Sequence, residues 1–190
     1  MNCIVAQEEG FWKVIKLTPF RRTPGVYFDI IPMEYFPRID GIDRVVHDRG
    51  AVSPGPVGAV ERTWYYHPFQ DDNLIVLQGQ RTAEIYNVIR KRVETFIVTP
   101  DKVTHDGEVI YDGPSLLVWP TEVFHRITSG DMGSVSINFA VRYPGFDIDT
   151  NFNIYDLDTA TCRYTLLRHG KVDQSPGLCS IQLPGCNRGT

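Results

Sequence analysis

Residues 65–79 (YYHPFQDDNLIVLQG) and 113–125 (GPSLLVWPTEVFH) decide which fold this 190-residue chain is expected to adopt. Each segment holds a short apolar run and one histidine, His67 in the first and His125 in the second. Turn-forming residues bound both runs, which is typical of strands. The two segments therefore predict two strand regions that each carry a histidine.

The rest of the chain continues this pattern of short β-rich runs separated by turn signals such as Asp112-Gly113-Pro114. No stretch has a helical period of any length, so the pattern favours an all-β protein, an antiparallel sandwich or barrel. Around the histidine segments the sequence predicts N-terminal strands at 11–18 and 26–31, a long loop at 32–57 and a less regular tail at 151–190.

Composition places the chain among ordinary globular domains and excludes several classes of function. A hydrophobic share of 42% is too high for a disordered chain. The net charge of −4 and the lack of a basic cluster argue against nucleic-acid binding. No run approaches the roughly 20 apolar residues of a membrane helix, and the first residues do not resemble a signal peptide. We therefore expect one cytoplasmic domain over residues 1–190, with no nucleic-acid or membrane partner.

The four cysteines show no CxxC spacing, which excludes a zinc ribbon or a thioredoxin-type motif. They lie near the two ends of the chain, at Cys3, Cys162, Cys179 and Cys186. In a cytoplasmic protein we expect free thiols that serve as small apolar residues.

The first histidine segment resembles the first motif of the cupin superfamily of small β-barrels. His67 matches the second histidine of that motif, Asp72 falls at its glutamate position, and Gly79 closes the motif six residues later. Tyr65 stands where the family has its first histidine. The match therefore keeps two of the three metal ligands that this motif supplies in the family.

The second segment resembles the second cupin motif, with Pro120, Glu122 and His125 at the proline, glycine and histidine positions. The resemblance implies an antiparallel cupin-type jelly-roll β-barrel. Its core would span residues 57–141, with N-terminal strands and the long loop in residues 1–56 and a C-terminal extension in residues 142–190.

Two histidines and one carboxylate form the ligand set of many metal enzymes. Residues two apart on a strand face the same way, so Tyr65 and His67 share one face. If His125 lies on the adjoining strand, then His67, Asp72 and His125 can converge and bind Fe, Mn, Ni or Zn. Because one of the family's usual ligands is missing, the sequence leaves open whether a divalent metal or no cofactor is bound.

The main interpretation is a cupin-fold enzyme of unknown small-molecule substrate, a metal-dependent oxygenase or isomerase. One alternative is a non-catalytic cupin that binds a sugar or a carboxylate. Another, implied by the epimerases and ketoisomerases of the same superfamily, is a metal-free enzyme with His67 as general base and Asp72 beside it. Those enzymes need a basic residue to hold a diphosphate, and only Arg62 and Arg81 lie on suitable strands.

The residues expected to act on a small-molecule ligand lie within or beside the two motifs. His67 and Tyr65 are the candidate catalytic residues. The candidate substrate-binding residues are Gln70, Trp119, Phe124 and Asn138. His47, in the predicted long loop, is expected to be solvated.

The N-terminal strands have no obvious place in the predicted barrel. Unpaired strand edges favour pairing with another chain. We therefore expect a homodimer in which residues 11–18 and 26–31 extend the sheet of the partner.

Overall fold

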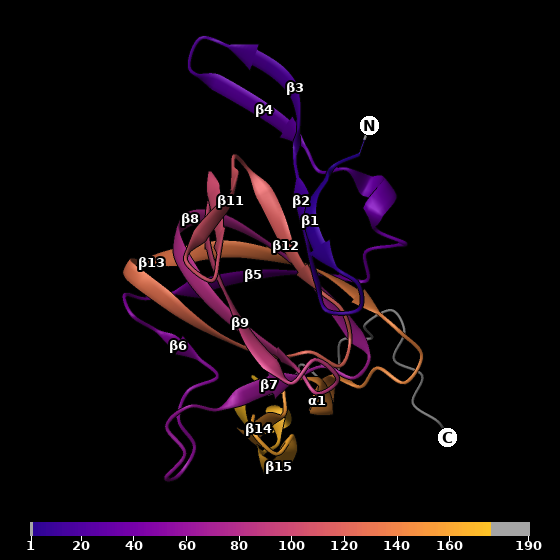
Figure 1. The fold of residues 1–190 in the computed structure, drawn as a ribbon, viewed down its shortest axis with the longest axis vertical. Helices are drawn as coiled ribbons and strands as arrows, with labels where there is room; N and C mark the ends of the chain where they lie inside the picture. The colour runs from indigo at the N-terminus through magenta and orange to yellow at the C-terminus, as the bar shows by residue number, and fades with distance from the viewer. Residues whose placement is uncertain (1, 176–190) are drawn as a thin grey trace.

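The computed structural model describes residues 2–175, which form an antiparallel β-structure with very little helix (Figure 1). Two long strands, β8 (Gln70–Asn87) and β13 (Phe124–Arg142), pair with each other along most of their length. The register shifts between Ser129 and Ser134, where both strands pass from one layer to the other. The result is a two-layered jelly-roll sandwich.

Each layer is built around one half of the β8–β13 pair. The first layer adds β5 (Gly41–His47) beside β13, and β12 (Ser115–Trp119), β2 (Trp12–Lys16) and β1 (Ile4–Glu8) beside β8. The second layer adds β6 (Val52–Ser53) and β7 (Trp64–Tyr66) beside β13, and β9 (Arg92–Thr99), β10 (Lys102–His105) and β11 (Glu108–Asp112) beyond β8.

The remaining elements lie outside these two layers. The strands β14 (Ile154–Asp158) and β15 (Arg163–Arg168) extend the second layer at β7, and β3 (Thr18–Thr23) and β4 (Val26–Ile30) form a separate hairpin. Helical structure is limited to η1 (Met33–Tyr35), α1 (Ile148–Asn151) and η2 (Gly170–Asp173). Within residues 2–175, no helix is long and apolar enough to cross a membrane.

The core lies between the layers because strand alternation turns every second side chain inward. On β8 these are Ala83 and Ile85, and on β9 they are Phe96 and Val98, all fully buried. Burial of each large side chain among them, such as Ile85 or Phe96, stabilises the fold by about 1.5–3 kcal/mol. A second apolar cluster on the outer face of the first layer is covered by Phe36, which follows η1.

The all-β antiparallel prediction is confirmed, but the layers form a sandwich and not a closed barrel. The strand expected at 11–18 does have a place in the sheet, since β2 lies between β1 and β12. The stretch expected to be a loop, residues 32–57, contains β5 and β6. Cys3 is buried, and Cys162 is half-buried with its Sγ 3.1 Å from the hydroxyl oxygen of Tyr86. Cys179, Cys186 and the end of the predicted tail lie outside the described residues, so the free thiols stay a prediction.

Glu122 stands at the glycine position of the second motif and keeps the backbone conformation that favours glycine. Its φ is +64°, in the left-handed region that costs a residue with a side chain about 1–2 kcal/mol. Its backbone N–H donates to the carbonyl oxygen of His67 at 3.0 Å, so this turn joins the two histidine segments.

We predict that Glu122→Gly raises the free energy of unfolding by about 1 kcal/mol, because glycine adopts a positive φ without strain. Urea denaturation measures the change. The matched control is Glu108→Gly on the exposed edge strand β11, which should lower stability by about 0.5–1 kcal/mol. Equal loss of stability in both variants would contradict the prediction.

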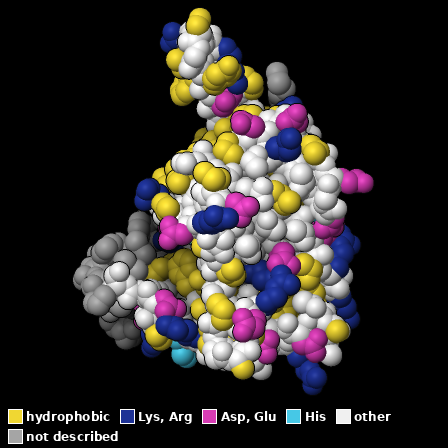
Figure 2. All heavy atoms as spheres, turned by 90° about the vertical axis from the view of Figure 1, so that its left-hand side faces the viewer, with side chains coloured by type: hydrophobic (Ala, Val, Ile, Leu, Met, Phe, Trp, Pro, Cys, Tyr) yellow, Lys and Arg dark blue, Asp and Glu magenta, His cyan; other side chains and the backbone are white. Residues whose placement is uncertain are grey.

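The β3–β4 hairpin projects away from the rest of the molecule (Figures 1 and 2). Large apolar side chains on it are exposed, among them Phe20, Tyr27 and Phe28. An isolated two-stranded hairpin is marginally stable in water. The homodimer stays a prediction, and we propose that this hairpin, rather than residues 11–18, makes the contact with the partner.

The triple variant Phe20→Ser, Tyr27→Ser, Phe28→Ser should sediment as a monomer, because it removes the apolar surface that a partner would cover. The wild-type chain should sediment as a dimer at micromolar concentration. The double variant Ile89→Ser, Met132→Ser removes exposed apolar residues elsewhere and should stay dimeric. A monomeric wild-type protein would rule out the dimer.

Candidate functional site

A cavity of about 310 Å³ lies between the two layers. Its floor consists of buried side chains from both layers, namely His67, Gln70, Asp72, Leu74, Arg81, Trp119, His125 and Ile127. Its rim consists of half-buried residues, namely Asp43, Val45, His47, Ser53, Tyr65, Asn138 and Phe152. The size is suited to a small organic molecule.

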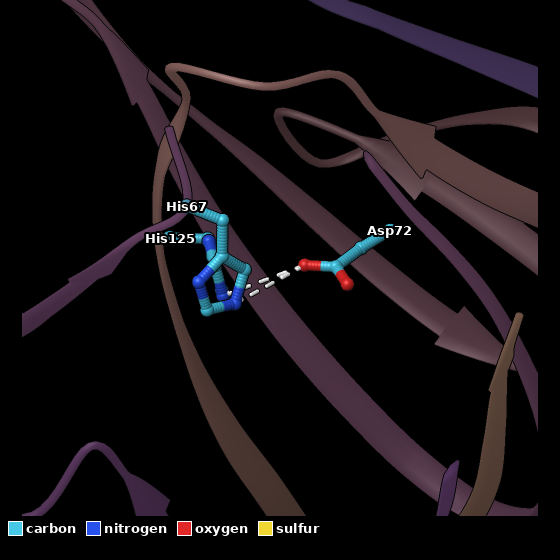
Figure 3. A group of neighbouring side chains, drawn as sticks. All are labelled: His67, Asp72 and His125. Carbon is cyan, nitrogen blue, oxygen red and sulfur yellow. Dashed lines mark ion pairs between the residues drawn. The ribbon is translucent and has the colours of Figure 1, made fainter. Parts of the chain in front are cut away.

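His67, Asp72 and His125 converge on the cavity floor from three elements (Figure 3). His67 follows β7, Asp72 lies at the start of β8, and His125 lies at the start of β13. The Nε2 atoms of His67 and His125 lie 3.5 Å and 3.8 Å from Oδ2 of Asp72. One ligand atom from each of the three residues lies within 4.8 Å of the others.

Backbone carbonyl groups fix the orientation of both imidazoles. Nδ1 of His67 contacts the carbonyl oxygen of Asn151, and Nδ1 of His125 lies 3.4 Å from that of Val123. A carbonyl oxygen only accepts, so each Nδ1 carries a proton, and Nε2 is the nitrogen with the lone pair in the neutral form of each imidazole. Burial lowers the pKa of His125 to about 4, which keeps this imidazole neutral at pH 7.

Three neutral donors hold the Asp72 carboxylate in place. Its Oδ1 accepts from the amides of Asn138 at 2.7 Å and Gln70 at 2.9 Å, and its Oδ2 accepts from the indole of Trp119 at 3.1 Å. The side-chain oxygen of Gln70 in turn accepts from Asn151 at 3.3 Å. The carboxylate is therefore rigidly placed beside the two imidazoles.

Tyr65 forms the rim directly above the histidines. Its ring stacks on His67 with a centroid distance of 6.2 Å and an interplanar angle of 22°. Burial raises the pKa of the phenol, which therefore keeps its proton at neutral pH. A protonated phenol at this place is a hydrogen-bond donor for a ligand and a poor metal ligand.

Most residues expected to form the site line this one cavity, including Gln70, Trp119 and Asn138. Phe124 does not, which corrects its assignment as a pocket wall. It is fully buried in a separate aromatic cluster with Trp64 and Tyr86, because its side chain points to the opposite face of β13 from His125.

Four cavity residues were missed because they lie in the stretch expected to be a loop: Ser53 of β6 and three residues of β5. Asp43, Val45 and His47 come from β5 and face inward, whereas Ile42 and Val46 face outward. The alternation of residues 41–47 is the signal that identifies this strand. Burial raises the pKa of Asp43, and burial together with Arg81 lowers that of His47 to about 4.

The two histidines and the carboxylate fit a divalent metal by their chemistry. Two imidazoles with protonated Nδ1 atoms anchored by carbonyls and one oriented carboxylate are a common ligand set for Fe, Mn, Ni or Zn. A bound metal would be held by His67, Asp72 and His125. Metal binding stays a prediction.

We predict that added Zn²⁺ binds to the wild-type protein and that His125→Ala abolishes this binding, because two ligands remain. Equilibrium dialysis with elemental analysis measures the bound ion, and circular dichroism shows whether the variant stays folded. His169→Ala, a histidine outside the cavity, is the control and should bind normally. Equal stoichiometry in all three proteins would contradict a site at His125.

No protein-family model and no curated protein matches this chain. Solved structures do match its fold. A sugar 3,4-ketoisomerase from Thermoanaerobacterium thermosaccharolyticum in complex with TDP is 14% identical, with a TM-score of 0.51 over 74% of this chain and 85% of that chain. The dTDP-4-dehydrorhamnose 3,5-epimerase from Bacillus anthracis is 11% identical, with a TM-score of 0.52 over 73% and 75%.

A dTDP sugar isomerase from Desulfovibrio desulfuricans is similar to the same degree, at 15% identity and a TM-score of 0.51 over 74% of this chain and 87% of that chain. At such low sequence identity, the similarity shows a shared backbone fold only. The comparisons therefore show that the chain has the cupin-type jelly-roll fold of these sugar isomerases and epimerases.

Proposed function

We propose that this protein is a metal-independent isomerase or epimerase of a small keto sugar, with His67 as the base that removes a proton next to the carbonyl group. The observation that carries the proposal is the His67–Asp72 pair on the floor of a cavity of small-molecule size. The ketoisomerases and epimerases that share the fold support it. The metal-dependent oxygenase expected from the motifs has no such support.

In the proposed reaction the C–H bond beside the carbonyl breaks and its proton passes to Nε2 of His67. The electron pair forms a C=C bond, and the carbonyl oxygen becomes an enolate oxygen. A second acid, such as the phenol of Tyr65, then donates a proton to the same carbon from the opposite face, which gives an epimer; solvent takes the proton from His67 and returns one to that acid. When the deprotonated carbon carries a hydroxyl group, the enolate oxygen takes a proton and gives an enediol. Loss of the proton from that hydroxyl group and delivery of the proton on His67 to the former carbonyl carbon then give an isomer.

Asp72 supports this role of His67 through charge. Proton abstraction leaves a positive imidazole, and the Asp72 carboxylate 3.5 Å away stabilises that charge. The bond from Nδ1 of His67 to the carbonyl oxygen of Asn151 fixes the tautomer with a free Nε2. Both contacts are buried, so water weakens them little.

Tyr65 is suited to donate a proton or a hydrogen bond to the developing enolate. It lies against both imidazoles, with ring centroids 6.2 Å from His67 and 5.8 Å from His125. Its raised pKa keeps the phenol protonated until the charge on the substrate oxygen develops. A second candidate, a metal-dependent isomerase in the same cavity, is favoured by the convergence of His67, Asp72 and His125.

We predict that His67→Gln lowers exchange of the substrate α-proton with solvent by about 10²–10⁴-fold, because the variant lacks the base. NMR in D₂O measures the exchange with TDP-linked 4-keto sugars, keto-sugar phosphates and keto-sugar acids as probes. Tyr65→Phe should lower it less. The matched control is His105→Gln, a histidine outside the cavity, which should leave the rate unchanged.

Treatment with a chelator separates the two candidates. The metal-independent reaction keeps its rate after dialysis against EDTA, whereas a metal-dependent isomerase loses it and recovers with added ion. If none of the probes exchanges its proton, although one binds in the cavity, the chain is a ligand-binding protein and the catalytic proposal is wrong.

A further inference from the structure

Arg81 is a buried cation for which the described part of the chain supplies no counter-ion. It lies in the middle of β8, lines the cavity floor and is 4% exposed. Its Nε donates to Oγ of Ser134 at 3.1 Å, but its Nη2 is buried and has no hydrogen-bond partner among the described residues. Within residues 2–175, no carboxylate lies within ion-pair distance of it, whereas Arg126 is paired with Glu84.

Such an arrangement is costly unless something supplies the missing charge. Burial lowers the pKa of Arg81 to about 10, which still leaves the guanidinium charged at neutral pH. A buried charge with no opposite charge destabilises a protein strongly. Because Arg81 lines the cavity, its lack of an opposite charge points to an anion that residues 2–175 do not provide and that enters the cavity.

A chain of hydroxyl groups links Arg81 to His47. Ser134 accepts from Arg81, its hydroxyl lies 2.8 Å from that of Ser129, and Ser129 lies 3.0 Å from Nδ1 of His47. Both hydroxyl protons have an acceptor when the hydrogen bonds run in one direction: Ser134 donates to Ser129, and Ser129 donates to Nδ1 of His47. His47 then carries its proton on Nε2, as a second donor beside the guanidinium.

The two acidic groups that line the cavity lie together and are not paired with Arg81. The acidic groups, Asp43 and Asp72, are joined to each other through the amide of Asn138 on the side of His67. Arg81 acts electrostatically on His47, whose pKa of about 4 keeps it neutral at pH 7. An anion beside Arg81 therefore does not have to displace a carboxylate.

We propose that Arg81, with His47, binds a terminal anionic group of the substrate, a carboxylate or a phosphate monoester. The proposal deepens the proposed function, since it names the substrate class of the same cavity. A planar guanidinium with free N–H groups is well suited to both anions.

The anion is terminal because of where Arg81 lies. Ser129 and Ser134 beside it are only 4% and 3% exposed, so little space remains beyond the guanidinium. A diphosphate carries substituents on both sides and would need room there for a nucleoside. The cavity of about 310 Å³ is better filled by a keto-sugar acid or phosphate whose reactive carbon reaches His67.

The test uses inorganic phosphate, acetate and TDP as probes in calorimetric titrations of the full chain at constant ionic strength. Phosphate or acetate should bind saturably, and Arg81→Met should weaken that binding at least 10-fold. Arg62→Met, which alters an exposed arginine paired with Glu84, is the matched control and should bind normally. Whichever of phosphate and acetate binds with the higher affinity identifies the terminal group as a phosphate monoester or a carboxylate.

A second readout separates ligand binding from a structural role. Arg81→Met should raise the melting temperature of the ligand-free protein, because it removes an unpaired buried charge; a structural arginine would lower it. If Arg81→Met does not fold, a crystal of the wild-type protein grown with phosphate should show the anion at the guanidinium. Absence of the anion would overturn the proposal.

Other outcomes also decide. Binding of TDP but of neither small anion would show that the bound anionic group is not terminal. Binding of phosphate or acetate by Arg81→Met as tightly as by the wild-type protein would place the anion site away from Arg81. His67→Gln should retain anion binding, because the two groups act separately. Proton exchange in His67→Gln tests the proposed base, and anion binding in Arg81→Met tests the proposed anion site. Either proposal can therefore fail while the other holds.

Discussion

The pairing of β8 with β13 is the constraint on which the site depends. The two strands pass together from one layer to the other, and this bend requires Gly79 opposite Ser134. Gly79 has a φ of +72°, and a Cβ there would lie 2.0 Å from the carbonyl oxygen of Gly133. No side chain fits. Asp72 and Arg81, on the two sides of this bend, therefore line one cavity from different layers.

The sequence predicted the residues that local rules control. Alternation placed Tyr65 and His67 on one face, and the motif spacing identified Asp72 and His125. It did not predict β5, because the turn residues around 41–47 obscured a short alternating run. The sequence could not show that Arg81 is buried without an opposite charge either, because this depends on which side chains surround it in the folded protein. Such information exists only in the tertiary structure.

Two departures from the cupin motifs have different physical consequences. Glu122 keeps the left-handed backbone of the glycine it stands for, so the turn and its hydrogen bond to His67 survive the change. Tyr65 changes the chemistry instead. A neutral phenol donates a proton where an imidazole would offer a lone pair. Compared with the motif that this segment resembles, the site therefore has one metal ligand fewer and an acidic group beside the proposed base.

The electrostatics of the cavity fit the proposed proton chemistry on an anionic substrate. His125 is neutral, and one carboxylate, Asp72, lies beside the proposed base. Abstraction of a proton places positive charge on His67, which Asp72 compensates, and negative charge on the substrate, which Tyr65 can meet by hydrogen bonding. Arg81 takes no part in that exchange of charge. Its unpaired guanidinium can therefore hold the substrate by a fixed anion through every step, which separates binding from catalysis within one small cavity.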